Sequence, residues 1–209
     1  MAIYVYTDEF IPEYYAHYPL ITNANDTSGN DRNITTSWAT SYGSDGAVFP
    51  NSNHDGLLIP FNIDFSQKWT ICTYTKITWY NNVQDSRLID IYNSSNRIDC
   101  RVDTASRKYL ILKNNSSELY RSSYTLWEWL CICITVDNWS VKTYTNWTLN
   151  ATTTFTGITT YFRFWQEYNK WADRHLYGNI KEIIIEDKAR TAQEVSDYFN
   201  GTKSNYGIQ

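Results

Sequence analysis

The chain has 209 residues, a length at which one β-sandwich buries a sizeable core, so we expect a single domain over residues 1–209. Its 18 basic and 22 acidic residues are interspersed and give a net charge of −4, which excludes the basic stripe that nucleic acid binding needs. Aromatic residues make up 17% of the sequence, with 9 Trp and 18 Tyr, and this composition favours sheet over helix.

Two further classes are disfavoured by the sequence. It contains no run of about 18 apolar residues, so we expect no membrane insertion. The first ten residues, MAIYVYTDEF, have neither the basic nor the apolar region of a secretory signal, which predicts synthesis and folding in a cytoplasm.

Short runs with a two-residue apolar period alternate with polar turn clusters, which predicts strands. The clearest run is RIDCRVD at 97–103, where Ile98, Cys100 and Val102 share one face. The charged residues of this run share the other face, which we expect to be in contact with water. The remaining strands are predicted at 56–59, 69–80, 87–92, 109–113, 129–136, 141–146, 161–165 and 180–186.

One helix is predicted near the C-terminus, where Thr191 and Glu194 form a capping box. Val195, Tyr198 and Phe199 follow at helical spacing on one face and would dock the helix by this apolar stripe. Gly201 offers a C-terminal stop, so we expect about three turns.

The four cysteines lack the paired spacing of a zinc site and occupy mostly apolar segments, so we expect buried free thiols at Cys72, Cys100, Cys131 and Cys133. Cys131 and Cys133 would share a strand face about 6.8 Å apart, near the upper limit of disulfide reach. We therefore expect no bridge between them.

Three stretches resemble, in the right order, the laminin G-like branch of the concanavalin A-like lectin and glucanase superfamily. Residues 18–30, YPLITNANDTSGN, are similar to the family's opening strand and its Asn/Asp-rich turn. Residues 129–146 look like its paired strands around an aspartate turn, and 177–199 like its closing strand and helix, with Lys181 where an acidic residue is usual. The resemblance implies an all-β, two-sheet antiparallel jelly-roll sandwich with one short C-terminal helix.

The same family includes glucanases, whose paired carboxylates stand in a Glu-x-Asp-x-x-Glu motif that this chain lacks. Glu182 and Glu186 would lie about 13 Å apart along a strand, beyond the roughly 5 to 9.5 Å of glycoside hydrolases. Glu186 and the adjacent Asp187 would point to opposite faces. We therefore expect no enzyme, and a divergent glycoside hydrolase is the less favoured alternative.

Laminin G-like modules often bind calcium, which prefers clustered oxygen ligands from loops. The candidate ligands lie in or beside predicted loops and are Asp26, Asp45, Asp55 and Asp64. Turns also need such residues for their own geometry, and we favour that interpretation.

Sugar recognition commonly combines exposed aromatic faces with amide and carboxylate groups. Candidates for such a platform stand at strand ends and in turns: Trp79, Tyr80, Asn81, Asn82, Trp147, Trp165, Tyr168 and Trp171. Trp69, Trp127, Trp129 and several tyrosines are expected to fill the core, and other rings would suit a subunit contact. For any single ring we favour the core or an interface over a sugar.

A lectin-like fold without a catalytic pair or an export signal is typical, by analogy of fold and context, of bacteriophage virion surface proteins. We therefore predict a head fibre, capsid decoration or tail adhesin that is made in the host cytoplasm. Its expected partners are other virion proteins, further copies of itself and cell-surface carbohydrate. A free cytoplasmic lectin is the alternative.

Overall fold

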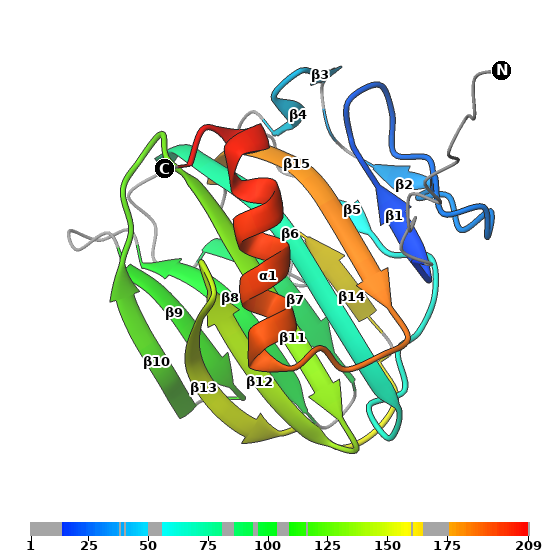
Figure 1. Ribbon diagram of the computed structural model, residues 1–209. Coiled ribbons are helices and arrows are strands. Elements are labelled where there is room, and N and C mark those ends of the chain that lie inside the picture. The colour runs from blue at the N-terminus through cyan, green and yellow to red at the C-terminus, as the bar shows by residue number, and fades with distance from the viewer. Residues whose placement is uncertain are drawn as a thin grey trace, which may run out of the picture.

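The computed structural model describes residues 14–37, 39, 41–49, 56–80, 86–93, 96–103, 109–115, 117–159, 161–164 and 176–208. Their strands form two antiparallel sheets packed face to face, and one helix, α1 (Ala192–Thr202), lies across the outer side of one sheet (Figure 1). The predicted sandwich with a short C-terminal helix is thus confirmed. No helix in the described part of the chain is long and apolar enough to cross a bilayer.

Sheet A consists of β1 (Ala16–Tyr18), β3 (Ser41–Gly43), β4 (Gly46–Phe49), β6 (Lys68–Tyr80), β11 (Trp129–Asp137), β12 (Ser140–Thr145), β13 (Thr148–Thr154) and β15 (Leu176–Glu186). Its order is β13-β12-β11-β6-β15-β4-β3, and β1 also pairs with β15. Sheet B consists of β2 (Thr36–Ser37), β5 (Leu57–Leu58), β7 (Ser86–Tyr92), β8 (Arg97–Asp103), β9 (Tyr109–Asn114), β10 (Ser117–Ser123) and β14 (Tyr161–Phe164). Its order is β10-β9-β8-β7-β14-β5-β2.

The main core fills the space between the two sheets. Alternate residues of each central strand point inward, as the two-residue period predicts. The buried side chains include Ile71, Ile132, Ile134, Ile183 and Ile185 from sheet A and Ile89, Ile91, Ile98, Phe162 and Phe164 from sheet B.

A second apolar cluster lies on the outer face of sheet A, where Val195 and Phe199 of α1 are buried. Burial of each side chain stabilises the docked helix by about 1.5 to 3 kcal/mol. The capping box is confirmed, since Thr191 and Glu194 each accept a hydrogen bond from the other's backbone N–H. The predicted stop at Gly201 is wrong. The helix continues to Thr202 and into the 3-10 turn η1 (Lys203–Tyr206), and the left-handed Gly207 (φ 69°) ends it.

Cys72 of β6 and Cys133 of β11 face each other in the antiparallel register and form a disulfide, with 4.1 Å between their Cα atoms. The prediction of free thiols is therefore wrong for this pair, because cross-strand neighbours come from distant parts of the sequence. Cys100 and Cys131 are free and buried, as expected. Burial raises the pKa of the Cys131 thiol to about 12, so this thiol is protonated and unreactive at neutral pH.

The outer face of β8 differs from its prediction. Asp99 is fully buried and Arg101 is 9% exposed, so this face is not the wet surface that alternation indicates. The physical reason is pairing between charges: guanidinium groups of β7 and β8 surround carboxylates of the same two strands.

The strand directions bring many connections to one end of the sandwich, at the top of Figure 1. Because neighbouring strands are antiparallel, strands β6, β8, β10, β12 and β14 all end here. The chain after α1 reaches it too (Figure 1). We call it the loop end.

Candidate functional site

A pocket of about 480 Å³ opens at the loop end, between the β10–β11 connection, the β12–β13 turn and the C-terminal segment. It is lined by Trp127, Glu128, Trp129, Asn146, Tyr206, Gly207 and Ile208. A smaller pocket of about 130 Å³ shares Glu128, Trp129 and Asn146 with it. We call the larger one the aromatic pocket.

Trp127 is the most exposed ring of this pocket, with 69% of its surface accessible. Its backbone has a φ of 70° and donates a hydrogen bond to the carbonyl oxygen of Ile77 at 2.9 Å. A left-handed conformation costs an L-residue about 1 to 2 kcal/mol, so a bulky ring here is unusual. The expectation that Trp127 fills the core is wrong, because the β10–β11 connection turns outward at this residue. Trp69 is buried as predicted, and Trp129 is half-buried.

Trp147, a predicted platform residue, is 46% exposed beside the pocket. It forms the β12–β13 turn with Asn146, and both residues are left-handed, with φ of 65° and 45°. Such turns usually carry Asn-Gly, since glycine adopts this conformation without strain. One side of the Trp147 ring packs on Phe199, with 4.5 Å between centroids. The turn therefore presents the rest of the ring to solvent.

Asn146 supplies the pocket with a polar group of fixed orientation. Its side-chain oxygen accepts a hydrogen bond from the backbone N–H of Cys131 at 2.9 Å. Its NH₂ group has no partner among the residues that the structure describes, so it is available to a ligand oxygen. Glu128 adds an exposed carboxylate to the same lining.

The floor of the pocket is packed tightly against sheet A. Tyr206 stacks on Tyr74 with 3.7 Å between centroids, and the Lys181 ammonium group lies 5.1 Å from the Tyr206 ring. The ammonium group of Lys76 lies 4.7 Å from the Trp129 ring. These two rings are thus fixed supports, whereas Trp127 and Trp147 are the rings that a ligand can reach.

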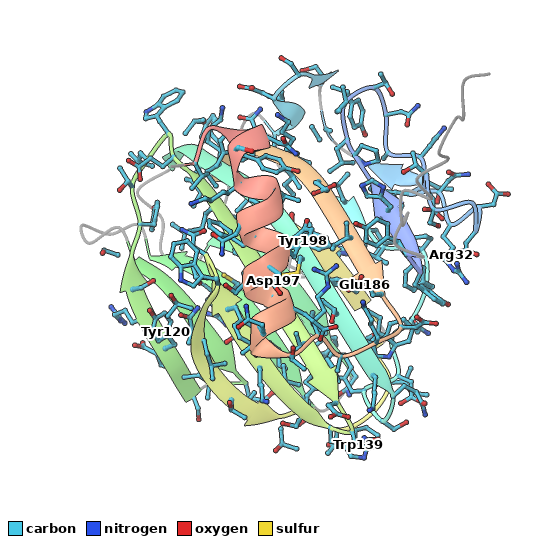
Figure 2. All side chains as sticks on the ribbon, viewed as in Figure 1. Arg32, Tyr120, Trp139, Glu186, Asp197 and Tyr198 are labelled. Atoms are coloured by element: carbon cyan, nitrogen blue, oxygen red, sulfur yellow. A yellow bond between two sulfur atoms is a disulfide. The ribbon has the colours of Figure 1, made fainter. Side chains whose placement is uncertain are left out.

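The half-buried carboxylate of Glu182 holds the pocket wall in place. It accepts hydrogen bonds from the Tyr206 hydroxyl at 2.7 Å and the Tyr198 hydroxyl at 2.9 Å, and its other oxygen lies 2.9 Å from His17 Nε2. Tyr198 comes from α1 (Figure 2). Burial raises the pKa of Glu182, but the bonds from His17, Tyr206 and Tyr198 outweigh burial and bring the pKa below its usual value.

Glu182→Gln is expected to remove one pH-dependent part of the stability. Because its pKa is lowered from 4.5 in the folded protein, ionised Glu182 stabilises the fold above that pH, and the contribution is lost as pH falls through the lowered pKa. At neutral pH the variant should lose about 2 kcal/mol of unfolding free energy in urea titrations. The two proteins should converge in stability as the pH is lowered. A pH-independent difference would contradict this role for the ionised carboxylate.

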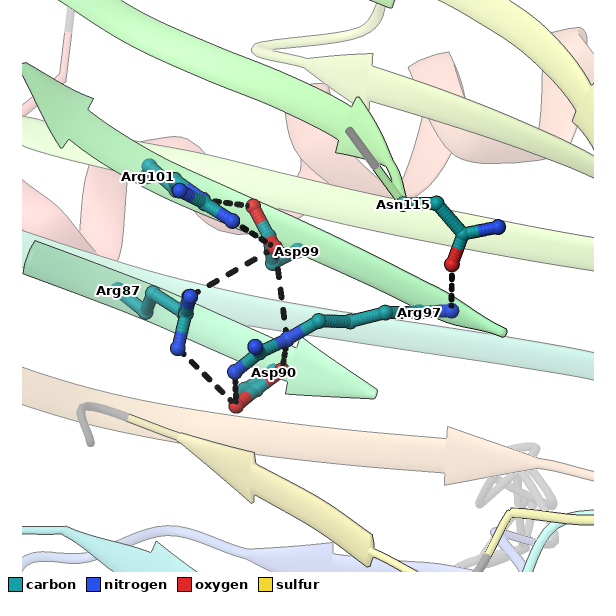
Figure 3. A network of polar contacts seen from close by, with 6 residues as sticks. All are labelled: Arg87, Asp90, Arg97, Asp99, Arg101 and Asn115. Atoms are coloured by element: carbon teal, nitrogen blue, oxygen red, sulfur yellow. Dashed lines mark hydrogen bonds and ion pairs between the residues drawn. The ribbon is translucent and has the colours of Figure 1, made fainter. Parts of the chain in front are cut away.

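A second polar group, which we call the arginine network, lies on the outer face of sheet B (Figure 3). Arg97 makes a bidentate contact to Asp90, and Arg101 makes one to Asp99. Arg87 lies 3.6 Å from the Asp99 carboxylate and 3.8 Å from that of Asp90. These ion pairs link the arginine and aspartate side chains of β7 and β8, most of which are buried.

Burial dominates the electrostatics of this network. It lowers the pKa of Arg87 even though Asp90 opposes it, and it raises the pKa of Asp99 despite the hydrogen bonds from Arg101. Transfer of these groups from water into the protein therefore disfavours the charged form of the arginine and of the aspartate alike.

The predicted glycan platform is described only in part. Trp147 lies beside the aromatic pocket, and Trp79 and Tyr80 end strand β6 at the loop end, with side chains outside the described set. The others fall outside the described residues: Asn81, Asn82, Trp165, Tyr168 and Trp171. Trp127, Glu128 and Asn146 were missed, because only the three-dimensional turns show that they share a pocket.

The predicted calcium ligands are engaged separately. The Asp26 carboxylate accepts hydrogen bonds from the backbone N–H groups of three residues in its own region, at 2.9 to 3.0 Å. Asp45 pairs with Lys76 at 2.8 Å, and Asp64 accepts from the Ser66 N–H at 2.9 Å. Asp55 falls outside the described residues. Within the described ranges, no three His, Cys, Asp or Glu residues are grouped to hold a metal ion.

The acidic residues considered for hydrolysis are likewise in separate contacts. Glu186 is 2% exposed and forms a bidentate ion pair with Arg190, at 2.6 and 2.9 Å. Glu182 binds His17 and two tyrosines, as described above. Both carboxylates therefore have a structural role in the packing of sheet A.

Comparison with solved structures supports the sandwich fold. Trypanosoma rangeli sialidase in complex with sialic acid superposes with a TM-score of 0.74 at 11% identity, over 91% of this chain and 33% of that chain. The binding domain of Paraclostridial Mosquitocidal Protein 1 gives 0.65 at 15%, over 88% and 52%. Domain 4 of the arabinanase AbnA from Geobacillus stearothermophilus, in complex with arabinotriose, gives 0.62 at 20%, over 88% and 97%. At these identities the likeness shows the fold alone, and the chain spans about a third of the sialidase.

Compared by sequence with curated proteins, the chain matches none of them. The family model of the concanavalin A-like lectin/glucanases superfamily matches residues 43–196, from β3 into α1. This match covers most of the described strands and agrees with the two-sheet architecture. The chain therefore belongs to the concanavalin A-like lectin/glucanases superfamily.

Proposed function

We propose that the chain is a non-enzymatic carbohydrate-binding module whose ligand occupies the aromatic pocket. The observation that carries this proposal is Trp127, a 69% exposed ring held in a left-handed backbone conformation at the pocket edge. Strained positions persist where the surroundings impose them, and they concentrate at ligand sites. An exposed aromatic face suits the C–H surface of a sugar ring.

The rest of the pocket supplies what a sugar's hydroxyl groups need. Asn146 offers a donor and Glu128 offers an acceptor, while Trp147, next to Asn146 in the same turn and outside the lining, adds a second accessible ring nearby. A concave site with aromatic side chains and a few placed polar groups is a common form of small-molecule site. The fold relatives include an arabinanase domain in complex with arabinotriose, which supports a carbohydrate as the ligand class.

Trp127→Gly is expected to weaken glycan binding strongly while the fold is retained. Loss of the ring should weaken binding by about tenfold or more. Glycine adopts the left-handed conformation without strain, but it loses more conformational entropy on folding. Because these two effects oppose each other, the unfolding free energy should change by less than about 1 kcal/mol. A glycan array followed by calorimetry on its hits measures binding, and urea denaturation measures stability.

Trp139→Gly is the matched control for this experiment. Trp139 is also a left-handed turn tryptophan, with a φ of 71°, but it lies at the opposite end of the sandwich (Figure 2). It packs against the main core, so its loss should lower stability and leave glycan binding intact. Undiminished binding by Trp127→Gly would rule out the aromatic pocket as the site.

The proposal of binding without catalysis is supported by the state of the acidic side chains. Glu182 and Glu186 are held in contacts with His17 and Arg190, and both lie on the outer face of sheet A beneath α1. A general acid and a nucleophile must instead flank a sugar from two sides.

We further propose that the module acts on a bacteriophage virion, as a head fibre, capsid decoration or tail adhesin built from several copies. Adhesion requires binding without turnover, which suits a carbohydrate-binding sandwich, and the support is analogy of fold. Mass spectrometry of purified particles is expected to detect the protein. Its restriction to the particle-free cell extract would favour a free lectin.

A further inference from the structure

We propose that the outer face of sheet B is a second subsite, at which Arg97 binds the carboxylate or sulfate group of an acidic sugar. The proposal rests on the carbohydrate-binding function above and adds the chemical class of the ligand.

The network carries more positive than negative charge. Arg87, Arg97 and Arg101 share it with Asp90 and Asp99, so three guanidinium groups face two carboxylates. Arg163 of β14 lies directly opposite Asp90 and adds a further guanidinium group beside the network. Among the described side chains of this network, guanidinium groups thus outnumber carboxylates, although the net charge of the chain is −4.

The network is layered, with its excess charge toward solvent. The side chains of Asp99 and Arg87 are 0% and 4% exposed and form the base. That of Asp90 is also 4% exposed, whereas that of Arg97 is 20% exposed and forms the outer layer. An arriving anion therefore meets a cation first, with the carboxylates behind it.

Arg97 retains unused hydrogen-bond donors. Its Nε and Nη2 atoms contact Asp90, with 2.7 Å between Nε and the nearer carboxylate oxygen. Its Nη1 group has no partner among the described residues, so two N–H groups remain for an anion. Guanidinium groups bind carboxylates and sulfates with strong, directional hydrogen bonds.

A half-buried ring lies beside these donors. Tyr92 is directly opposite Arg97 in the β7–β8 register, and its centroid is 5.9 Å from Arg97 Cζ. An aromatic ring next to an arginine matches a sugar that carries an acidic group, because the ring contacts C–H bonds while the guanidinium binds the anion. A free inorganic anion would make no use of the ring.

The test is an array on which each acidic glycan is printed beside its neutral counterpart: sialylated with asialo, sulfated with unsulfated, uronic acid with its methyl ester. The wild-type protein is expected to bind the acidic members about tenfold more tightly. Arg97→Gln should remove this preference, and Asp90→Asn should increase it, since it removes a competing carboxylate. Arg121→Gln is the matched control, because Arg121 is an exposed arginine of the same sheet paired with Glu118.

The outcomes separate the two proposals. Equal binding of acidic and neutral members by the wild type, or a preference that survives in Arg97→Gln, would overturn the acidic-sugar subsite alone. Binding of no glycan at all would overturn the carbohydrate-binding function as well. If Arg97→Gln fails to fold, the wild-type comparison and the opposite shift in Asp90→Asn still decide the matter.

Discussion

Reduction of the Cys72–Cys133 disulfide is expected to lower the free energy of unfolding by about 4 kcal/mol. The bond joins residues 61 positions apart, and opening so long a loop restores much conformational freedom to the unfolded chain. The measurement is urea denaturation with and without dithiothreitol. The Cys72→Ala/Cys133→Ala double variant should match the reduced protein.

Thiol counting under denaturing conditions provides the control. Cys100 and Cys131 should give two reactive thiols before reduction, and all four cysteines should react afterwards. Cys100→Ala should remain as sensitive to reductant as the wild type, because Cys100 takes no part in the bond. Four thiols in the unreduced protein would disprove the disulfide.

Gly46→Ala is expected to destabilise the protein by about 3 kcal/mol or more. Gly46 has a φ of 82°, and an added Cβ would lie 2.1 Å from the Ile180 carbonyl oxygen and 2.5 Å from Lys181 Cα. Both are backbone atoms of β15, so no side chain can move aside to relieve the clash. The pairing of β4 with β15 would have to shift, which thermal or urea denaturation would detect.

Substitutions at two other glycines distinguish the effect of backbone strain from that of a steric clash. Gly29 has a φ of 89° with nothing within 4 Å of an added Cβ, so Gly29→Ala should cost only about 1 kcal/mol. Gly201 lies within α1 with open space around it, and Gly201→Ala should stabilise the helix by about 0.5 to 1 kcal/mol. Equal effects at Gly46 and Gly29 would mean that the close approach to β15 is unimportant.

Much of the fold was predictable because its signals are local. Strand β8 has the predicted bounds, since apolar and charged residues alternate over its whole length. The start of α1 follows from a capping box of two residues three positions apart. The end of α1 was predicted wrongly, because the sequence does not show which glycine adopts a left-handed backbone conformation. Gly201 is helical, and Gly207 is the left-handed residue.

The edge strands were missed for a physical reason. Strands β10 and β13 have the sequences SELYRSS and TLNATTT, and both follow the same pattern of mostly exposed and half-buried positions. An edge strand contributes little to the core, so it needs no apolar period and resembles a loop in the sequence. Only its pairing with a neighbouring strand identifies it.

The two candidate sites were hidden for different reasons. Arg87 and Asp90 are three positions apart and would face opposite ways in a regular strand, but an irregular register between Arg87 and Ile89 brings them to one face. The aromatic pocket joins three segments that are far apart in sequence. Its most exposed ring is Trp127, which follows an apolar residue and precedes a predicted strand. This sequence context favoured the prediction that Trp127 is a core residue.

The placement of the last described residues governs how the protein can be attached to a sensor surface. Gly207 and Ile208 form a wall of the aromatic pocket, so a linker or fluorescent fusion added after Gln209 would start at the pocket mouth and obstruct it. Lys68 begins β6 at the far end and its side chain is 59% exposed. Coupling through Lys68→Cys would orient every immobilised molecule with the aromatic pocket toward the analyte.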